Sequence, residues 1–90
     1  DFTSRKIYVN ETELNMTPSE YEICCLLMKN PNRVFTKDEI YERIFGFDGI
    51  GDAETTIRER IKEIRKKFKV YNEEPIKTIW GVGYQWEKNQ

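Results

Sequence analysis

The sequence predicts a single α+β domain in which three helices lie between short antiparallel strands. Three observations carry this prediction. Helix-start patterns at residues 17–20 and 36–39 each precede apolar residues with helical spacing. A third helix is indicated by an apolar stripe at i, i+4, i+7 and i+11, formed by Ile57, Ile61, Ile64 and Phe68. Short strand-like runs at both ends of the chain complete the pattern.

The composition is that of an ordinary globular domain. The 90 residues are 38% hydrophobic and 34% charged, which allows a small core without a metal or disulfides. No apolar run approaches the roughly 20 residues that span a bilayer, and no secretory signal is apparent. We therefore expect a cytoplasmic domain without membrane contacts. Because structured-looking sequence begins at once, we expect it to be part of a longer protein.

No catalytic, cofactor or metal site is recognisable. Cys24 and Cys25 are adjacent in an apolar helix, where their side chains point about 100° apart, so we expect unpaired core residues. The chain has no histidine, which excludes Cys/His zinc sites and leaves the cysteines without a general base, and the acids are scattered on helix faces. A calcium loop starting at Asp48 would have Ile50 at a ligand position. We therefore predict that the protein is not an enzyme and needs no cofactor.

The first half of the chain begins with a predicted strand pair. Residues 5–9 and 13–16 read as short strands joined by a turn at 10–12. Thr17 and Glu20 then form a capping box, with Pro18 at the first helical position. The helix that follows is apolar nearly all round, so it should be the central buried helix. It should end at the Asn-Pro-Asn sequence of residues 30–32.

The second half contains two helices and a hairpin. Thr36 and Glu39 form another capping box, and Gly46 should end that helix. Residues 46–52 form a glycine-rich loop, and Asp52 can cap the third helix, roughly residues 53–69. Residues 76–86 read as two strands around a turn that contains Gly81 and Gly83. The predicted order is β-β-α-α-α-β-β.

The charge is unevenly distributed. The whole chain carries −1, but residues 54–69 hold seven Lys/Arg and three Glu, a net charge of +4, so the other 74 residues carry −5. Opposite the apolar stripe, at about 100° per residue, lie Thr55, Glu59, Lys62, Glu63 and Lys66, flanked by Thr56, Arg58, Arg60 and Arg65. A basic helix followed by a hairpin is typical of a winged-helix domain, which places such a helix in a DNA groove. The alternative is a solvated helix with Glu/Lys pairs.

With these features the chain resembles the C-terminal effector domain of OmpR/PhoB-type two-component response regulators. The resemblance covers nearly the whole chain. It is carried by residues 14–21, 34–40, 55–57, 61–68 and 76–84, and the Gly-x-Gly-Tyr that follows Lys-Thr in the last segment is quite specific in this combination.

The resemblance implies a winged helix-turn-helix with a short N-terminal antiparallel sheet, three helices and a C-terminal β-hairpin wing. It implies a bacterial transcription regulator in a phosphorelay, with a receiver domain upstream of this chain. The full-length protein would bind direct repeats of double-stranded DNA as a head-to-tail homodimer, whereas the isolated domain should be a monomer. A winged helix used only for protein contacts is the alternative function.

The resemblance also places the contact residues. DNA contacts would be made by Thr55, Thr56, Arg58, Glu59, Arg60, Lys62, Glu63, Arg65 and Lys66 in the helix and by Thr78 and Trp80 in the wing. The family's RNA polymerase-contacting loop would correspond to Phe47, Asp48, Ile50 and Asp52. The chain departs from the family pattern in two respects. Trp80 stands where many members have arginine, and two glutamates, Glu59 and Glu63, lie on the reading face, where they can accept from cytosine N4.

Overall fold

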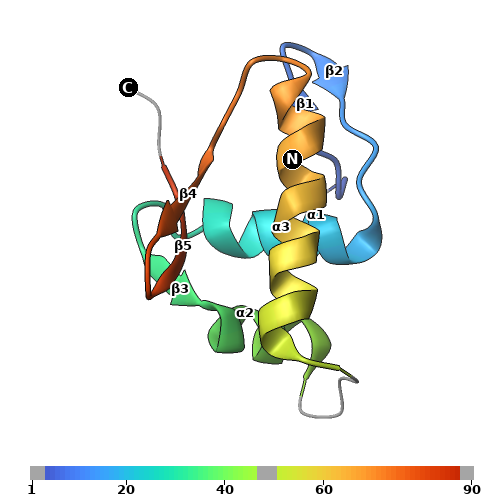
Figure 1. Ribbon diagram of the computed structural model, residues 1–90. Helices are drawn as coiled ribbons and strands as arrows, with labels where there is room; N and C mark the ends of the chain where they lie inside the picture. Colours follow the sequence, from blue (N-terminus) through green and yellow to red (C-terminus); the bar gives the residue numbers. More distant parts are fainter. Residues whose placement is uncertain (1–3, 47–50, 88–90) are drawn as a thin grey trace.

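A computed structural model describes residues 4–46 and 51–87. Within these ranges three helices pack together, with a small sheet at each of two edges (Figure 1). The elements are β1 (Tyr8–Val9), β2 (Thr12–Glu13), α1 (Pro18–Met28), β3 (Val34–Thr36), α2 (Lys37–Phe45), α3 (Ala53–Lys69), β4 (Ile76–Ile79) and β5 (Gly83–Trp86). The predicted α+β winged helix-turn-helix is confirmed.

Both predicted capping boxes are present. In α1, the backbone amide of Glu20 donates to Thr17 Oγ1 at 3.3 Å and the amide of Thr17 donates to Glu20 Oε1 at 3.0 Å. Thr36 and Glu39 make the same pair of bonds in α2, at 3.0 and 2.9 Å. The bond from the Thr36 amide holds the pKa of Glu39 below its ordinary value. These bonds satisfy amides that a helix leaves without a partner, and so they fix where each helix begins.

The apolar stripe of α3 forms the centre of the core. All four of its residues are buried, as the periodicity predicts. They pack with side chains from α1, α2 and β3; the largest that are fully buried are Phe35, Ile23, Leu27, Ile40, Ile57, Ile61, Ile64 and Cys24. Cys24 and Cys25 are unpaired, and burial raises the pKa of the Cys24 thiol far above its ordinary value. Across the described residues, no helix combines the length and the apolar character needed to cross a membrane.

The N-terminal strands are shorter than the sequence predicts, and the second begins one residue earlier, at Thr12, a residue predicted to lie in the turn. β1 and β2 have two residues each and are joined by a two-residue turn of Asn10 and Glu11, both with positive φ, as a type I′ hairpin requires. Positive φ at Arg5 interrupts the predicted first strand. Beyond the bond from the Leu14 amide to the Ile7 carbonyl, 2.8 Å, the second strand gives way to the segment that leads to the Thr17 cap.

The structure has a strand that the sequence did not predict, β3, between α1 and α2. It pairs antiparallel with β5, which also pairs with β4, so the sheet order is β3-β5-β4. Three residues are too few to show an alternating pattern, and the pairing partner lies some fifty residues further along the chain. The wing is therefore the outer part of a three-stranded sheet that is anchored directly before α2.

Candidate nucleic-acid interface

The outward face of α3 is where the sequence predicts it. The five residues placed opposite the apolar stripe are all exposed: Thr55, Glu59, Lys62, Glu63 and Lys66. They lie along a helix of 17 residues that stands in front of α1 and α2 in Figure 1. Glu63 and Lys66 form an exposed ion pair at 3.3 Å. The face thus presents alternating donors and acceptors along one line, as a helix that reads base edges does.

The four predicted flanking residues lie on two opposite sides of α3. Arg58 and Arg65 face the wing. Arg65 donates to the carbonyl of Ile76 at 2.9 Å and to Thr78 Oγ1 at 2.7 Å, and its guanidinium lies 5.6 Å from the ring centroid of Tyr84. Arg65 therefore links α3 to the wing and sets the spacing between them, and the hydroxyl of Thr78 is used for the same contact.

Thr56 and Arg60 lie on the other side, towards α1 and α2. Arg60 Nε donates to Ser19 Oγ at 3.0 Å, and its guanidinium lies 5.8 Å from the centroid of the Phe45 ring. On the same side Lys67 donates to the buried carboxylate of Glu20. Two basic side chains of α3 thus hold the helix against the first turn of α1, and a count of lysines and arginines overstates the charge available to a ligand.

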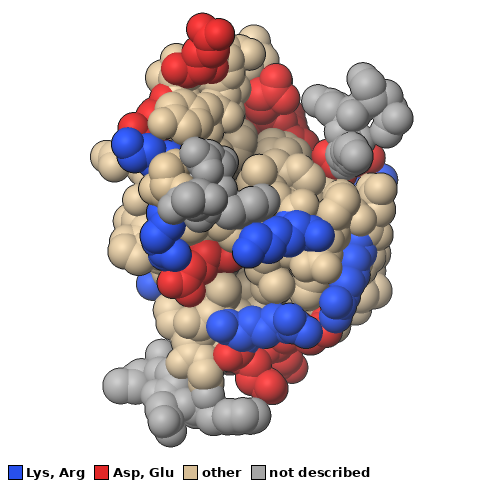
Figure 2. Space-filling model, turned by 180° about the vertical axis from the view of Figure 1, so that it is seen from behind, with Lys and Arg blue, Asp and Glu red and all other residues tan. Residues whose placement is uncertain are grey.

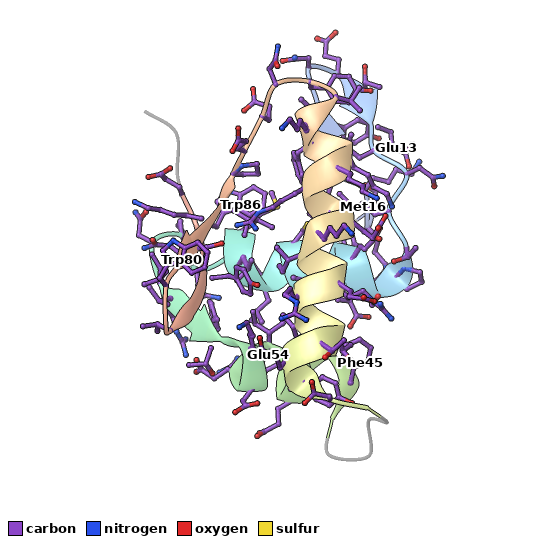
Figure 3. The ribbon with its side chains drawn as sticks, in the orientation of Figure 1. Glu13, Met16, Phe45, Glu54, Trp80 and Trp86 are labelled. Atoms are coloured by element: carbon purple, nitrogen blue, oxygen red, sulfur yellow. The ribbon has the colours of Figure 1, made fainter. Side chains whose placement is uncertain are left out.

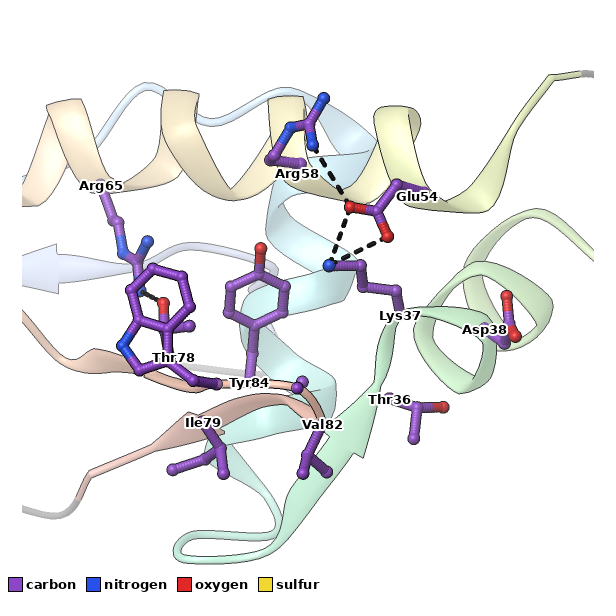
Figure 4. Close-up of a pocket in the computed structure, with 13 residues that line it drawn as sticks. Thr36, Lys37, Asp38, Glu54, Arg58, Arg65, Thr78, Ile79, Val82 and Tyr84 are labelled. Carbon is purple, nitrogen blue, oxygen red and sulfur yellow. Dashed lines mark hydrogen bonds and ion pairs between the residues drawn. The ribbon is translucent and has the colours of Figure 1, made fainter.

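The basic side chains that remain gather in the hollow between α3 and the wing. One cavity of about 240 Å³ is lined by Arg58, Lys62, Arg65, Lys66, Lys69 and Tyr84. A second, of about 600 Å³, continues towards the N-terminal ends of α2 and α3 (Figure 4). Both cavities lie along the same side of α3 and share Arg58 and Arg65, so with Lys37 six cationic side chains line one continuous depression. That depression has the charge and the position to hold a polyanion backbone.

The hairpin carries two tryptophans with different environments (Figure 3). Trp86 lies towards α3, where its ring packs edge-on against Phe68 at a centroid distance of 5.8 Å. Trp80 is 89% exposed in the turn and lines the larger cavity, and Val82 beside it is 52% exposed. Trp80 therefore does not fold back onto the domain. Its indole is available to a ligand that occupies the depression.

The N-terminus of α3 is capped by Asp52. Its Oδ2 accepts from the amide of Thr55 at 2.9 Å and from the Thr55 hydroxyl at 2.8 Å. The bond from that amide holds the pKa of Asp52 below its ordinary value. The predicted cap is thus confirmed, whereas Phe47, Asp48 and Ile50 of the predicted polymerase-contact loop lie outside the described residues.

The opposite face of the molecule has a different character. Seen from behind, basic and acidic side chains are interspersed with uncharged surface (Figure 2). The cavities lined by basic residues lie on the side where α3 meets the wing. Lys37, Lys69 and Tyr84 also line its cavities and are not among the predicted contacts. Lys69 lies within the basic segment, but only the folded arrangement brings Lys37 and Tyr84 to it.

An exposed basic helix, the second of a helix-turn-helix pair, with a β-hairpin beside it defines a winged-helix domain of the DNA-binding class. The family model described as "Transcriptional regulatory protein, C terminal" matches residues 11–86. The chain belongs to this family, the DNA-binding effector domains of OmpR/PhoB-type response regulators.

Individual relatives agree with this assignment. The transcriptional regulatory protein SpaR of Bacillus subtilis is 46% identical over 86 residues, which cover 96% of this chain and 39% of SpaR. The DNA-binding domain of the response regulator AdeR, solved in complex with an intercistronic region, superposes with a TM-score of 0.84 at 26% identity and covers 98% of this chain and 91% of its own. The OmpR/PhoB homologue DrrB of Thermotoga maritima superposes with a TM-score of 0.84 at 27% identity. The superposition covers 98% of this chain and 40% of the DrrB chain. The chain thus spans well under half the length of SpaR.

Proposed function

We propose that this domain binds double-stranded DNA with α3 in the major groove and the wing at the adjacent minor groove. The observation that carries the proposal is the convergence of six cationic side chains on one depression in a chain whose net charge is −1. Attraction confined to one face orients the domain on a polyanion. A helix of this diameter fits the major groove, where base pairs are distinguishable.

The contact residues divide into two roles. The proposed base contacts are the side chains that point outward from α3: Thr55, Glu59, Lys62, Glu63 and Lys66, with Thr56 at their edge. Arg58 faces the depression and is the proposed phosphate contact. Arg65 and Arg60 already bind protein groups, so we propose that they reach phosphates only through the guanidinium nitrogens that those bonds leave free. In the wing, Thr78 and Trp80 are the proposed contacts at the minor groove.

For the whole protein, we propose the output domain of a cytoplasmic two-component regulator. An upstream receiver domain would pair two copies on direct DNA repeats, and the isolated domain would be a monomer. The loop of residues 46–52, with Phe47, Asp48, Ile50 and Asp52, is the proposed RNA polymerase contact. The family membership and the two apolar residues in a glycine-rich connector support this proposal.

Salt dependence tests the proposed DNA binding. If the six cations of the depression release counterions, the logarithm of the binding constant should fall against the logarithm of the salt concentration with a slope of about −5. Fluorescence anisotropy with labelled duplexes, selected and random in sequence, measures the slope at several salt concentrations. A slope near zero, or no binding even at low salt, would contradict the proposal and favour a winged helix that contacts proteins.

A further inference from the structure

Among the carboxylates of the proposed interface, which include Glu59, Glu63 and Asp38, Glu54 is the one that bridges two cations from different helices. Glu54, in the first turn of α3, accepts from Lys37 Nζ with both oxygens at 3.0 Å and from Arg58 Nη1 at 3.2 Å (Figure 4). Lys37 is the first residue of α2 and Arg58 lies one turn further along α3. The carboxylate therefore joins the N-terminal turns of the two helices of the helix-turn-helix.

This cluster lies in the wall of the depression between α3 and the wing. Glu54, Lys37 and Arg58 line the larger cavity, whose other wall is formed by the wing. An anion that enters between α3 and the wing meets these two cations. A phosphate presents anionic oxygens to lysine and arginine donors in the same way as a carboxylate does.

We propose that Glu54 occupies the position of a DNA phosphate in the free protein and that DNA binding displaces it from Lys37 and Arg58. This inference rests on the proposed DNA binding. In the free domain the carboxylate neutralises and orients two phosphate-binding side chains. In the complex it remains nearby and repels the backbone that has replaced it.

The exposure of the three side chains permits the exchange. They retain 31% (Lys37), 53% (Glu54) and 61% (Arg58) of their accessible surface. Ion pairs that are this exposed contribute little to stability, so a phosphate can replace the carboxylate at small cost. Because the penalty is the same for every sequence, Glu54 lowers the affinity for all duplexes alike and leaves discrimination between sequences to the outward face of α3.

The test is the Glu54→Gln variant of this chain. Glutamine keeps the shape and the acceptor oxygen but removes the charge. Affinity for a random-sequence duplex should rise about tenfold at 100 mM salt, and the salt slope should steepen by about one to two. Glu22→Gln is the matched control, because Glu22 is also an exposed partner of one arginine, Arg5 at 3.6 Å, and lies in α1 away from the depression. It should change affinity less than twofold.

A second background shows whether the effect passes through the two cations. In a Lys37→Met, Arg58→Met variant, Glu54→Gln should raise affinity clearly less than in the unaltered chain, because only the direct repulsion of the backbone is then relieved. A gain of the same size in both backgrounds would overturn the proposed exchange at Lys37 and Arg58. Unchanged or weakened binding by Glu54→Gln, or equal gains from Glu54→Gln and Glu22→Gln, would overturn the inference while leaving DNA binding intact. If the unaltered chain bound no duplex at any salt concentration, the proposed function itself would fail. Circular dichroism of each variant confirms that the fold is retained.

Discussion

Gly83→Ala is expected to destabilise the domain by about 3 kcal/mol or more, which is the range of the most damaging single substitutions. A Cβ atom at residue 83 would lie 1.9 Å from the carbonyl oxygen of Phe35 and 2.9 Å from Cα of Thr36. Both are backbone atoms of β3, so no side-chain rotation can relieve the overlap. The β3–β5 pairing must open, and with it the contact that anchors the wing.

Gly81→Ala is the matched control. Gly81 has a φ of +79° in the turn, but a Cβ there would meet nothing within 4 Å. The cost is then only that of a left-handed backbone conformation, about 1 kcal/mol. Urea denaturation followed by circular dichroism compares the two variants. Equal unfolding midpoints for Gly83→Ala and Gly81→Ala would show that the close approach of β5 to β3 is not what requires glycine.

Lys67→Met is expected to lower the free energy of unfolding by about 2–3 kcal/mol at pH 7, because it leaves the carboxylate of Glu20 buried without its cation. Glu20 is only 4% exposed, whereas the Lys67 side chain keeps 29% of its surface. We therefore expect less than the full cost of an unpaired buried charge. Lys66→Met, which breaks the exposed pair with Glu63, should cost under about 0.5 kcal/mol.

The pH dependence distinguishes a charge effect from a packing effect. Burial raises the pKa of Glu20, but the bonds from Lys67 and Thr17 outweigh it, and the pKa lies below its ordinary value of 4.5. A lowered pKa contributes stability that is complete above pH 4.5 and is lost as the pH falls through the folded-state pKa. Without Lys67 that contribution disappears. The difference in the free energy of unfolding between the unaltered chain and Lys67→Met should therefore become smaller between pH 7 and pH 3 in urea titrations. A difference of constant size would mean that the lost stability comes from packing.

The helices could be predicted because their signals are local. The capping boxes at Thr17 and Thr36 and the stripe from Ile57 to Phe68 depend on residues within a few turns of one another. The rotational placement of the outer α3 residues follows from the same stripe. Short-range hydrogen bonds and helical spacing are therefore enough to define the three helices and the exposed face of α3.

What the sequence did not predict depends on partners that are distant along the chain. β3 exists because β5 pairs with it, and Gly83 is required because that pairing is so close. Arg65 and Arg60 look alike in the sequence, yet one binds the wing and the other binds Ser19 of α1. The cluster of Lys37, Glu54 and Arg58 likewise forms only when α2 and α3 pack together.

The base preferences of α3 variants show directly whether α3 reads the bases with its outward face. Sites are first selected from a random DNA pool, and each variant is then titrated against the selected site and its single-base changes. Glu63 points outward beside Lys66, and a carboxylate accepts from cytosine N4. Glu63→Ala should therefore relax the preference for cytosine at one base pair, with a loss of roughly 1–3 kcal/mol of discrimination. Arg58→Ala should weaken binding to all sequences by a similar factor and reduce the slope of the salt dependence by about 1. If Glu63→Ala left the preference profile unchanged while Arg58→Ala altered it at one position, α3 would not present its outward face to the bases.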